Sequence, residues 1–414
     1  MQLVERHIIR DDKTLEDLCF KSARLYNFIN YHKRQAFFGK QDDFSEYEMN
    51  KILAEYNQED YRALPAATSQ QVCKQVFKAW KGYFAALKEF KKKPSKFLGM
   101  PKPPRYKNKQ GYNMASFSRS QFTIKEGYVH LCKKSNIPPF KTRITNKIQE
   151  IRIIPHATCF VIEVVYNQNP TKHENIKPEN FLSIDMGVNN TIATINNVGQ
   201  KPFIINGGML KSINNYYNRK KAKLQSYVGD KSSNRINTLT FKRNNKVNDA
   251  LHKFSKFILE YCLQYGIGTV IIGKNEKWKN KSKMSKRNNQ HFVSIPHAEL
   301  INKITYKLAV HGIKTIVQEE SYTSKVDHLA LETMEHHKKY LGKRKKRGLF
   351  VSSTGKLINA DINGSIGIAL KSKVVQDGGR FIKDLLNTGI AQMPVKLNLI
   401  NNPRKMQNIL CLKG

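Results

Sequence analysis

Apolar residues recur three or four positions apart through the first quarter of the chain. Residues 14–90 begin with one such series, made of Leu15, Leu18, Cys19, Ala23 and Tyr26. A second series runs from residue 68 to residue 90, with lysines between its apolar positions. This spacing gathers apolar side chains on one side of a helix, so the sequence predicts helices across this region. The pattern ends at a basic linker over residues 91–109, whose four prolines exclude a continuous helix.

After the linker the pattern changes to alternation of apolar and polar residues, which is typical of strands. FTIKEGYVHL at residues 122–131 predicts a β-hairpin, and IRIIPHATCFVIEVVY at residues 151–166 predicts two more strands. The first ten residues predict a further strand. The simplest arrangement joins residues 1–12 and 105–172 in a small β-barrel domain, which is interrupted by a helical domain and basic linker at residues 13–104.

A polar stretch over residues 167–180 separates this region from a series of strands and helices. The expected order is strands FLSID (181–185), TIATI (191–195) and PFIIN (202–206), helices near 208–228 and 245–264, strand GTVIIG (268–273), helix 295–312, strand IKTIVQEE (313–320) and a helix that opens at residue 359. Three meandering strands followed by alternating helices and strands predict a ribonuclease-H-like α/β sheet. We expect this domain to span residues 180–371, with a basic loop at 321–358. The structure of the tail, residues 372–414, is left open.

The chain carries 72 lysines and arginines against 32 acidic residues, a formal net charge of +40 over 414 residues. A compact protein with this charge repels itself, so we expect it to bind a polyanion through counterion release. The basic residues are interleaved with 18 tyrosines and 21 phenylalanines. Aromatic side chains stack on bases, which favours nucleic-acid binding over a ribosome-associated or membrane-surface role. The chain lacks a run of about 18 apolar residues and an apolar signal segment, so it is predicted to be cytoplasmic and without a membrane partner.

Cysteine and histidine do not form a recognisable metal-binding pattern. The six cysteines stand singly, without a CxxC pair, so the sequence predicts neither a zinc ribbon nor a disulfide framework. His328, His336 and His337 lie near one another in the sequence but have no cysteine partner. We interpret these histidines as solvated or as phosphate contacts.

Two aspartates stand where a cleft could form above the predicted sheet. Asp185 ends an apolar strand just before Gly187, and a carboxylate at a strand end can project into such a cleft. An aspartate before glycine also begins ordinary turns. Asp361 lies at the start of a predicted helix, where it could serve as the N-cap or as a carboxylate kept ionised for metal binding. A third carboxylate should come from the strands between them.

Five segments resemble, in the same order, the RuvC core of TnpB proteins, the insertion-sequence-encoded ancestors of type V CRISPR effectors. These segments are SIDMGVNNTIAT, DALHKFSKFILEY, VIIGKNEKWK, EESYTSKVDHLA and KRGLFVSSTGKLINADINGSIGIALK. Each is ambiguous by itself, but their order and spacing together are specific. The resemblance covers residues 180–371 most closely, extends to the linker and β region, and is weak over residues 14–90.

The resemblance implies an RNA-guided DNA endonuclease that cleaves guide-matched DNA next to a short flanking motif. Its parts would be a RuvC nuclease domain, a β-barrel wedge domain and a helical recognition domain, with residues 321–358 admitting the target strand. It further implies a guide RNA transcribed from the end of the mobile element, a double-stranded DNA target and a monomeric ribonucleoprotein, associated with the bacterial nucleoid when bound to its target. Asp185 and Asp361 would then be catalytic metal ligands. Such hydrolysis uses two Mg²⁺ ions held by three carboxylates, and no zinc is expected.

The chain departs from the common family pattern at two places. Many members carry the middle catalytic glutamate at the end of the fourth strand, where this chain has Gly273. Many also carry a four-cysteine zinc ribbon, whereas residues 321–358 contain no cysteine. The chain resembles a subgroup with the sequence EESYTSK, in which the glutamate follows the fifth strand. Glu320 is the favoured ligand, and Glu319 and then Glu276 are the alternatives. Neighbouring residues of a strand point to opposite faces, so at most one of Glu319 and Glu320 can enter the cleft.

Basic residues near the expected site form two candidate nucleic-acid surfaces. Arg219, Lys220 and Lys221, on the helix at 208–228, are expected to face the guide–target heteroduplex, whose backbone shape the protein would read. A second group within the loop at 321–358 is expected to contact target phosphates and comprises Lys343, Arg344, Lys346 and Arg347. The alternative function is a nuclease-inactive, RNA-guided DNA-binding protein, a repressor or transposon-maintenance factor, which the missing glutamate after the fourth strand favours.

Overall fold

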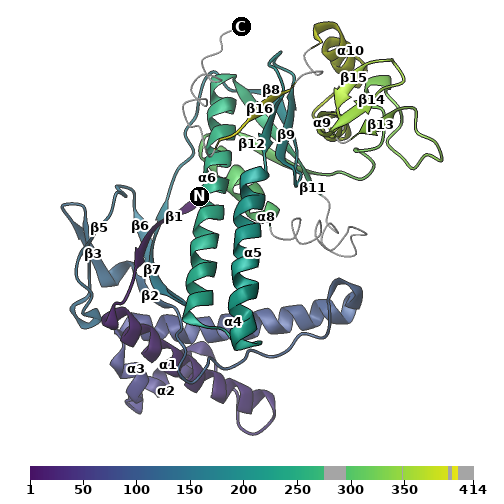
Figure 1. Ribbon diagram of the computed structural model, residues 1–414. Coiled ribbons are helices and arrows are strands. Elements are labelled where there is room, and N and C mark those ends of the chain that lie inside the picture. Colours follow the sequence, from purple (N-terminus) through teal and green to yellow (C-terminus); the bar gives the residue numbers. More distant parts are fainter. Residues whose placement is uncertain (275–294, 347, 390–393, 400–414) are drawn as a thin grey trace. The chain divides into compact units, whose positions relative to one another are not determined.

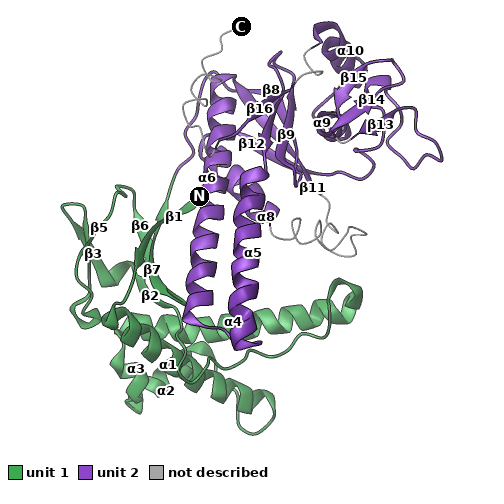
Figure 2. Ribbon diagram, in the orientation of Figure 1, with its two compact units in different colours: residues 1–168 green, residues 169–414 purple. Residues whose placement is uncertain are grey.

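The computed structural model describes residues 1–274, 295–346, 348–389 and 394–399 (Figure 1). The chain forms two compact units, residues 1–168 and residues 169–414, which Figure 2 draws in different colours. Each unit combines helices with β-sheet, so the mixed α/β, multidomain fold expected from the sequence is confirmed. No helix in the described part of the chain is long and apolar enough to cross a membrane.

The first unit contains two antiparallel sheets, with strand orders β1-β7-β6-β2 and β3-β4-β5. The strands are β1 (Gln2–Ile9), β2 (Ala115–Ser118), β3 (Phe122–Lys125), β4 (Tyr128–Leu131), β5 (Phe140–Lys141), β6 (Ile148–His156) and β7 (Cys159–Asn167). The turn from β3 to β4 places Glu126 and Gly127 at φ values of 51° and 76°. Positive φ at both central residues is the geometry of a tight two-residue hairpin turn, so the predicted hairpin forms as expected.

Helices of the first unit pack against the larger of these sheets and share one apolar core with it. They are α1 (Lys13–Phe37), α2 (Glu46–Glu55), α3 (Glu59–Ala63) and α4 (Ala66–Lys92). Asp12 begins α1, because its side chain accepts hydrogen bonds from the backbone N–H groups of Thr14 and Leu15 at 2.9 and 3.0 Å. A short 3₁₀ turn, η1 (Pro94–Lys96), follows α4 where the linker prolines begin.

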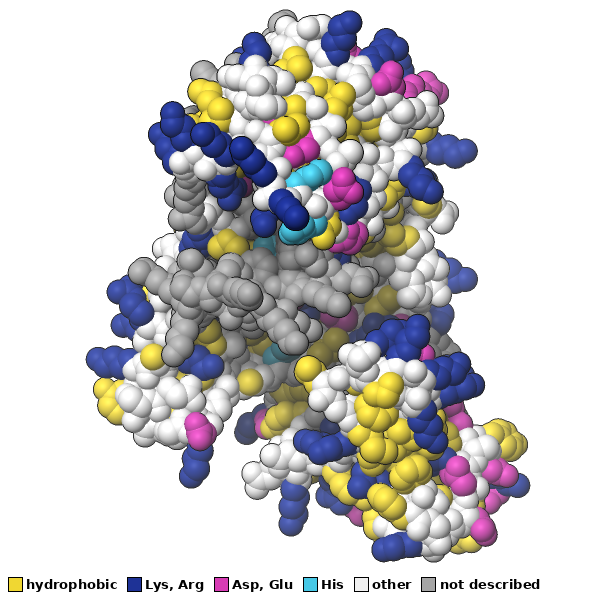
Figure 3. Space-filling model, turned by 90° about the vertical axis from the view of Figure 1, so that its right-hand side faces the viewer, with side chains coloured by type: hydrophobic (Ala, Val, Ile, Leu, Met, Phe, Trp, Pro, Cys, Tyr) yellow, Lys and Arg dark blue, Asp and Glu magenta, His cyan; other side chains and the backbone are white. Residues whose placement is uncertain are grey.

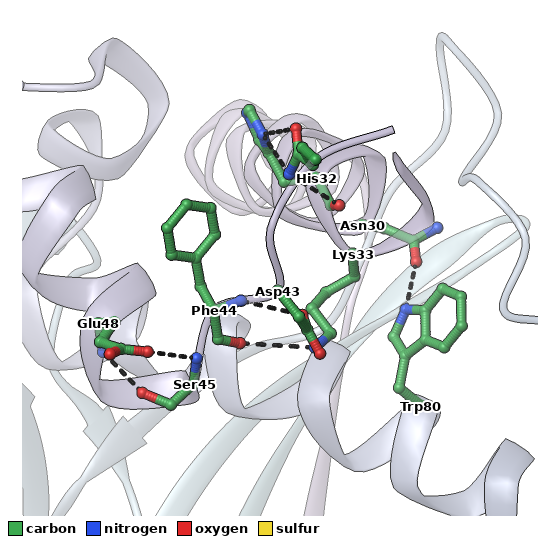
Figure 4. A network of polar contacts seen from close by, with 9 residues as sticks. Asn30, His32, Lys33, Asp43, Phe44, Ser45, Glu48 and Trp80 are labelled. Atoms are coloured by element: carbon green, nitrogen blue, oxygen red, sulfur yellow. Dashed lines mark hydrogen bonds and ion pairs between the residues drawn. The ribbon is translucent and has the colours of Figure 1, made fainter. Parts of the chain in front are cut away.

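A polar network connects α1, α2 and α4 inside this unit (Figure 4). The indole N–H of the buried Trp80 donates to Asn30 Oδ1 at 2.9 Å, which ties α4 to α1. Ser45 and Glu48 form a reciprocal capping box that begins α2. The helical spacing over residues 14–90 therefore predicted the right element type but missed the two short helices between α1 and α4.

The second unit is built on a six-stranded sheet with the order β12-β11-β8-β9-β10-β16. Its strands are β8 (Lys177–Asp185), β9 (Asn190–Asn196), β10 (Phe203–Asn206), β11 (Ile267–Lys274), β12 (Lys314–Glu319) and β16 (Val395–Leu397). β8, β9 and β10 form an antiparallel meander, and β11 pairs parallel with both β8 and β12. β16 pairs parallel with β10, so the ordered fold continues past residue 371 into the C-terminal tail.

Helices cover both faces of this sheet and bury its alternate residues in two separate cores. The helices are α5 (Gly208–Val228), α6 (Asn234–Gln264), α8 (His297–Val310), α9 (Ala360–Lys371) and α10 (Gly378–Thr388). Leu182 and Ile184 of β8 pack with α5, α6 and α8, whereas Phe181 packs with α9 and α10. Odd-numbered residues near the end of β8 therefore face α9, which decides where Asp185 lies.

The segment between β12 and α9 forms a small antiparallel sheet of β13 (Lys343–Lys346), β14 (Leu349–Val351) and β15 (Leu357–Asn359). A buried aspartate holds it without any cysteine. Asp327 Oδ2 accepts hydrogen bonds from Ser352 Oγ, Ser353 N and Ser353 Oγ at 2.9, 2.6 and 2.9 Å. Glu332 accepts from the backbone N–H groups of Asp327 and Leu341 at 2.7 and 2.8 Å. These carboxylates join the start of the segment to its last hairpin.

We predict that Asp327→Ala lowers the melting temperature by several degrees, because three donors lose their acceptor together. Hydrogen bonds to a charged group contribute about 1.5–3 kcal/mol each. Thermal unfolding measures the effect, with Ser353→Ala expected to lose less and Asp384→Ala, an exposed aspartate on α10, expected to match wild type. An Asp327→Ala protein that melts with wild type would contradict this role for the carboxylate.

Candidate active site

Asp185 ends β8 on the side of the strand that faces α9. Strand and helix are joined there by two reciprocal hydrogen bonds. Ser183 Oγ donates to the carbonyl of Ser365 at 2.8 Å, and Ser365 Oγ donates to the carbonyl of Ser183 at 2.9 Å. Gly364 makes this close approach possible, since a Cβ atom on it would lie only 2.6 Å from Asp185 Oδ2. The helix therefore encloses the carboxylate of Asp185 without displacing it.

Asp361 lies in the first turn of α9 and approaches Asp185 from the other element. The cap of this helix is Asn359, whose Oδ1 accepts from the backbone N–H of Asp361 at 2.9 Å. The carboxylate of Asp361 is therefore not used as the N-cap. Its Oδ2 accepts from Asn190 Nδ2 at 2.5 Å, and its Oδ1 lies 3.6 Å from the guanidinium of Arg344. Both contacts orient it beside the end of β8.

The two carboxylates are electrostatically coupled. Burial, and then the negative charge of Asp361, raise the pKa of Asp185 to about 7, although a backbone hydrogen bond and Arg344 act in the opposite direction. Two carboxylates held together without a cation disfavour the doubly ionised state. A cation bound between them would reverse this, because a metal favours the ionised form of its ligands.

Glu320 and Glu319 follow one another at the end of β12 but have different surroundings. Glu319 is exposed, and its carboxylate pairs with Lys371 Nζ at 2.5 Å and with Ser321 Oγ at 2.6 Å. Hydrogen bonds from Lys371 and Ser321 lower the pKa of Glu319. The Oε2 atom of Glu320 is buried and lies 2.8 Å from the position that a Cβ of Gly273 would occupy. Glu276 lies outside the described residues.

Asp185 and Asp361 supply the hard oxygen ligands that magnesium prefers. Burial and the charge of Asp361 raise the pKa of Asp185, and a bound cation would favour the ionised form of both. Gly364 leaves a space next to the carboxylate of Asp185 that any side chain would fill. These residues fit a divalent cation in donor chemistry. Across the described residues, however, no group of three or more His, Cys, Asp or Glu side chains is already arranged to hold a metal ion. Glu320 does not complete such a group in this conformation.

The basic candidates lie on two elements of the second unit. On α5, Arg219 and Lys220 are exposed and Lys221 is half-buried; Lys220 Nζ lies 6.0 Å from the ring centre of Tyr216. On β13, three candidates are exposed, namely Lys343, Arg344 and Lys346. Lysine and arginine side chains gather over β13–β15 on the face drawn in Figure 3. Arg347 lies outside the described residues.

Sequence reasoning misjudged one histidine and missed several site residues. His328 is fully buried rather than solvated: its Nε2 lies 2.8 Å from the carbonyl of Thr323, and burial lowers its pKa. It packs on Gly367 of α9, where a Cβ would lie 2.2 Å from the ring. Asn190 and Gly364 were not singled out. The signals available were Asn190 within SIDMGVNN and the glycine three residues after Asp361.

Two family models match separate stretches of the chain. Residues 163–279 match the model OrfB_IS605, described as a probable transposase. Residues 297–368 match the model of the Cas12f1-like TNB domain. The two matched ranges include Asp185, Glu320 and Asp361. No curated protein matches the chain in sequence.

One solved structure of low sequence identity shares this fold, and a second aligns less well. The protein in the cryo-EM structure of the Cas12f1–sgRNA–target DNA complex is 16% identical, with a TM-score of 0.54 over 86% of this chain and 81% of that one. The protein in a CRISPR-Cas12f ternary complex is also 16% identical, with a TM-score of 0.36 over 87% of this chain and 81% of that one. The family models show that these two ranges resemble IS605 OrfB and Cas12f1-like proteins, and the first of these structures shows a similar fold. The chain is therefore TnpB-like in these ranges, as its motifs predicted.

We predict that Asp185→Asn raises the melting temperature of the metal-free protein. Because the pKa of Asp185 is raised from 3.8 to about 7, folding is penalised as pH rises between these values, and the penalty levels off above them. The stabilisation by Asn should therefore grow from about pH 4 to pH 7 and then stay constant. Thermal unfolding in EDTA across this range measures it. A difference that does not change with pH would contradict the raised pKa of Asp185.

Proposed function

We propose that the chain is an RNA-guided DNA endonuclease and that its second unit is a RuvC-type, ribonuclease-H-like nuclease domain. The observation that carries the proposal is the meeting of Asp185 and Asp361, from segments far apart in the sequence, at a place where burial and the charge of Asp361 raise the pKa of Asp185. A shifted carboxyl pKa of this kind is typical of catalytic sites. The matches to IS605 OrfB and Cas12f1-like models support the same assignment.

In this proposal Asp185, Glu320 and Asp361 would hold two magnesium ions. Ions held there would activate a water and stabilise the leaving oxygen of a phosphodiester. Asn190 orients Asp361 through its hydrogen bond at 2.5 Å. Arg344, exposed and 3.6 Å from Asp361, would hold a phosphate of the strand to be cut.

The proposed partners are a guide RNA and a double-stranded DNA target. A net charge of +40 requires a polyanion of considerable size. The Cas12f1 structure of similar fold is a complex with an sgRNA and target DNA. We assign Arg219, Lys220 and Lys221 of α5 to the heteroduplex backbone, and Lys343, Lys346 and Arg347 with Arg344 to the target strand. For the first unit we propose a wedge domain, residues 1–12 and 105–172, and a recognition domain, residues 13–104.

The experiment that tests this function uses the protein purified from its host together with its RNA. We predict that RNA sequencing yields one structured species and that the complex cleaves guide-matched DNA in Mg²⁺ within a library of flanking sequences. Asp185→Ala and Asp361→Ala should abolish cleavage yet keep guided binding, because each removes a metal ligand but no phosphate-binding cation. Asp249→Ala, at an exposed aspartate of α6, is the matched control. No cleavage by wild type across the library would leave only the nuclease-inactive, DNA-binding alternative.

Glu320→Gln should reduce cleavage as severely as Asp185→Ala, because the amide keeps the volume but removes the charge that magnesium needs. Glu319→Gln should reduce it little, since the carboxylate of Glu319 already pairs with Lys371 at the surface. Single-turnover cleavage rates of the two variants distinguish them. If Glu319→Gln is the damaging change, the ligand is one residue earlier; if neither matters, Glu276 becomes the candidate.

A further inference from the structure

Gly273 stands at a position of β11 where the backbone itself does not require glycine. It is an extended strand residue that pairs in register with Gln318 of β12. Glycine inside a strand weakens it, since it loses more backbone freedom on folding and contributes no packing. Its presence therefore indicates that something occupies the space of a side chain at this position.

Two groups occupy that space. A Cβ atom on Gly273 would lie 2.3 Å from Cδ1 and 3.0 Å from Cγ1 of the buried Ile368, and 2.8 Å from Oε2 of Glu320. Ile368 belongs to α9, one turn after the Gly364 that encloses Asp185. The space left by the missing side chain of Gly273 therefore faces α9, the helix that carries Asp361.

The register of the sheet places this space beside Asp185. Ile272 of β11 is paired with Ile184 of β8, so Gly273 is level with Asp185 on the neighbouring parallel strand. Level residues of paired strands point to the same face and lie about 4.8 Å apart. Glu320 follows the end of β12, one strand further out, and its Oε2 lies next to Gly273 of β11.

We infer that Gly273 is a positioning residue, whose lack of a side chain lets the carboxylate of Glu320 lie over β11 on the side facing Asp185. The inference rests on the proposed nuclease function and names the condition for Glu320 to take part in it. A side chain at 273 would displace the carboxylate of Glu320 from this space. Either position could supply a carboxylate to it, but not both at once.

Mn²⁺ titration followed by electron paramagnetic resonance tests this on the RNA-bound protein, with cleavage as a second readout. Gly273→Ala should weaken Mn²⁺ binding about tenfold or more, as Glu320→Ala does, while guided DNA binding stays at the wild-type level. Gly273→Glu combined with Glu320→Ala should recover most of the Mn²⁺ affinity that Glu320→Ala loses. Wild-type affinity in Gly273→Ala, or no recovery in the exchanged pair, overturns the inference.

A variant controls for simple crowding against α9. Gly273→Ala with Ile368→Ala removes the 2.3 Å contact but keeps the 2.8 Å contact with Glu320. The double variant should have the melting temperature of Ile368→Ala alone and should still bind Mn²⁺ weakly. If it instead binds Mn²⁺ as tightly as Ile368→Ala does, Gly273 serves packing only. If wild type cleaves DNA and Gly273→Ala matches it in cleavage and Mn²⁺ binding, this inference fails while the nuclease function stands. If wild type never cuts but Gly273→Ala weakens Mn²⁺ binding, the nuclease function fails and the inference stands.

Discussion

The close approach of Asp185 and Asp361 is the constraint on which the second unit depends. Two carboxylates are held together at a half-buried position, and the pKa of Asp185 is raised to about 7 as a result. Contacts of α9 with its neighbours keep them there: the absence of a side chain at Gly364, the paired serines that fix the helix to β8, the amide of Asn190 on β9 and the guanidinium of Arg344. Repulsion between two carboxylates lowers stability, and it is typically retained where a function requires it.

The segment between β12 and α9 links this pair to the rest of the site. It begins at Glu320, packs His328 on Gly367, and ends at the cap of α9. Hydrogen bonds to the buried carboxylate of Asp327 tie its two ends together. These hydrogen bonds order the segment without a cysteine, and its exposed β13 brings Arg344 to Asp361. The same segment positions a candidate ligand, a candidate phosphate contact and the helix that carries Asp361.

Much of this could be predicted from periodicity and turn chemistry. The apolar segment FLSID predicted the strand that Asp185 ends, and the alternation over residues 122–131 predicted the hairpin. Periodicity missed α2 and α3, because short helices carry few repeats, and it placed the start of α6 at 245 instead of Asn234. The roles of Gly273 and Gly364 depend on contacts between distant segments, and sequence spacing does not contain them. The burial of His328 was missed for the same reason.

The central claim is that Asp185, Asp361 and Glu320 together form one metal site. Anomalous scattering from crystals of the RNA- and DNA-bound protein soaked in Mn²⁺ tests it most directly. The account predicts a manganese peak bonded to carboxylate oxygens of Asp185 and Asp361, with Glu320 as a third protein ligand next to Gly273. A manganese held by the two aspartates while Glu320 stays away from it, or no manganese between them, would contradict the account.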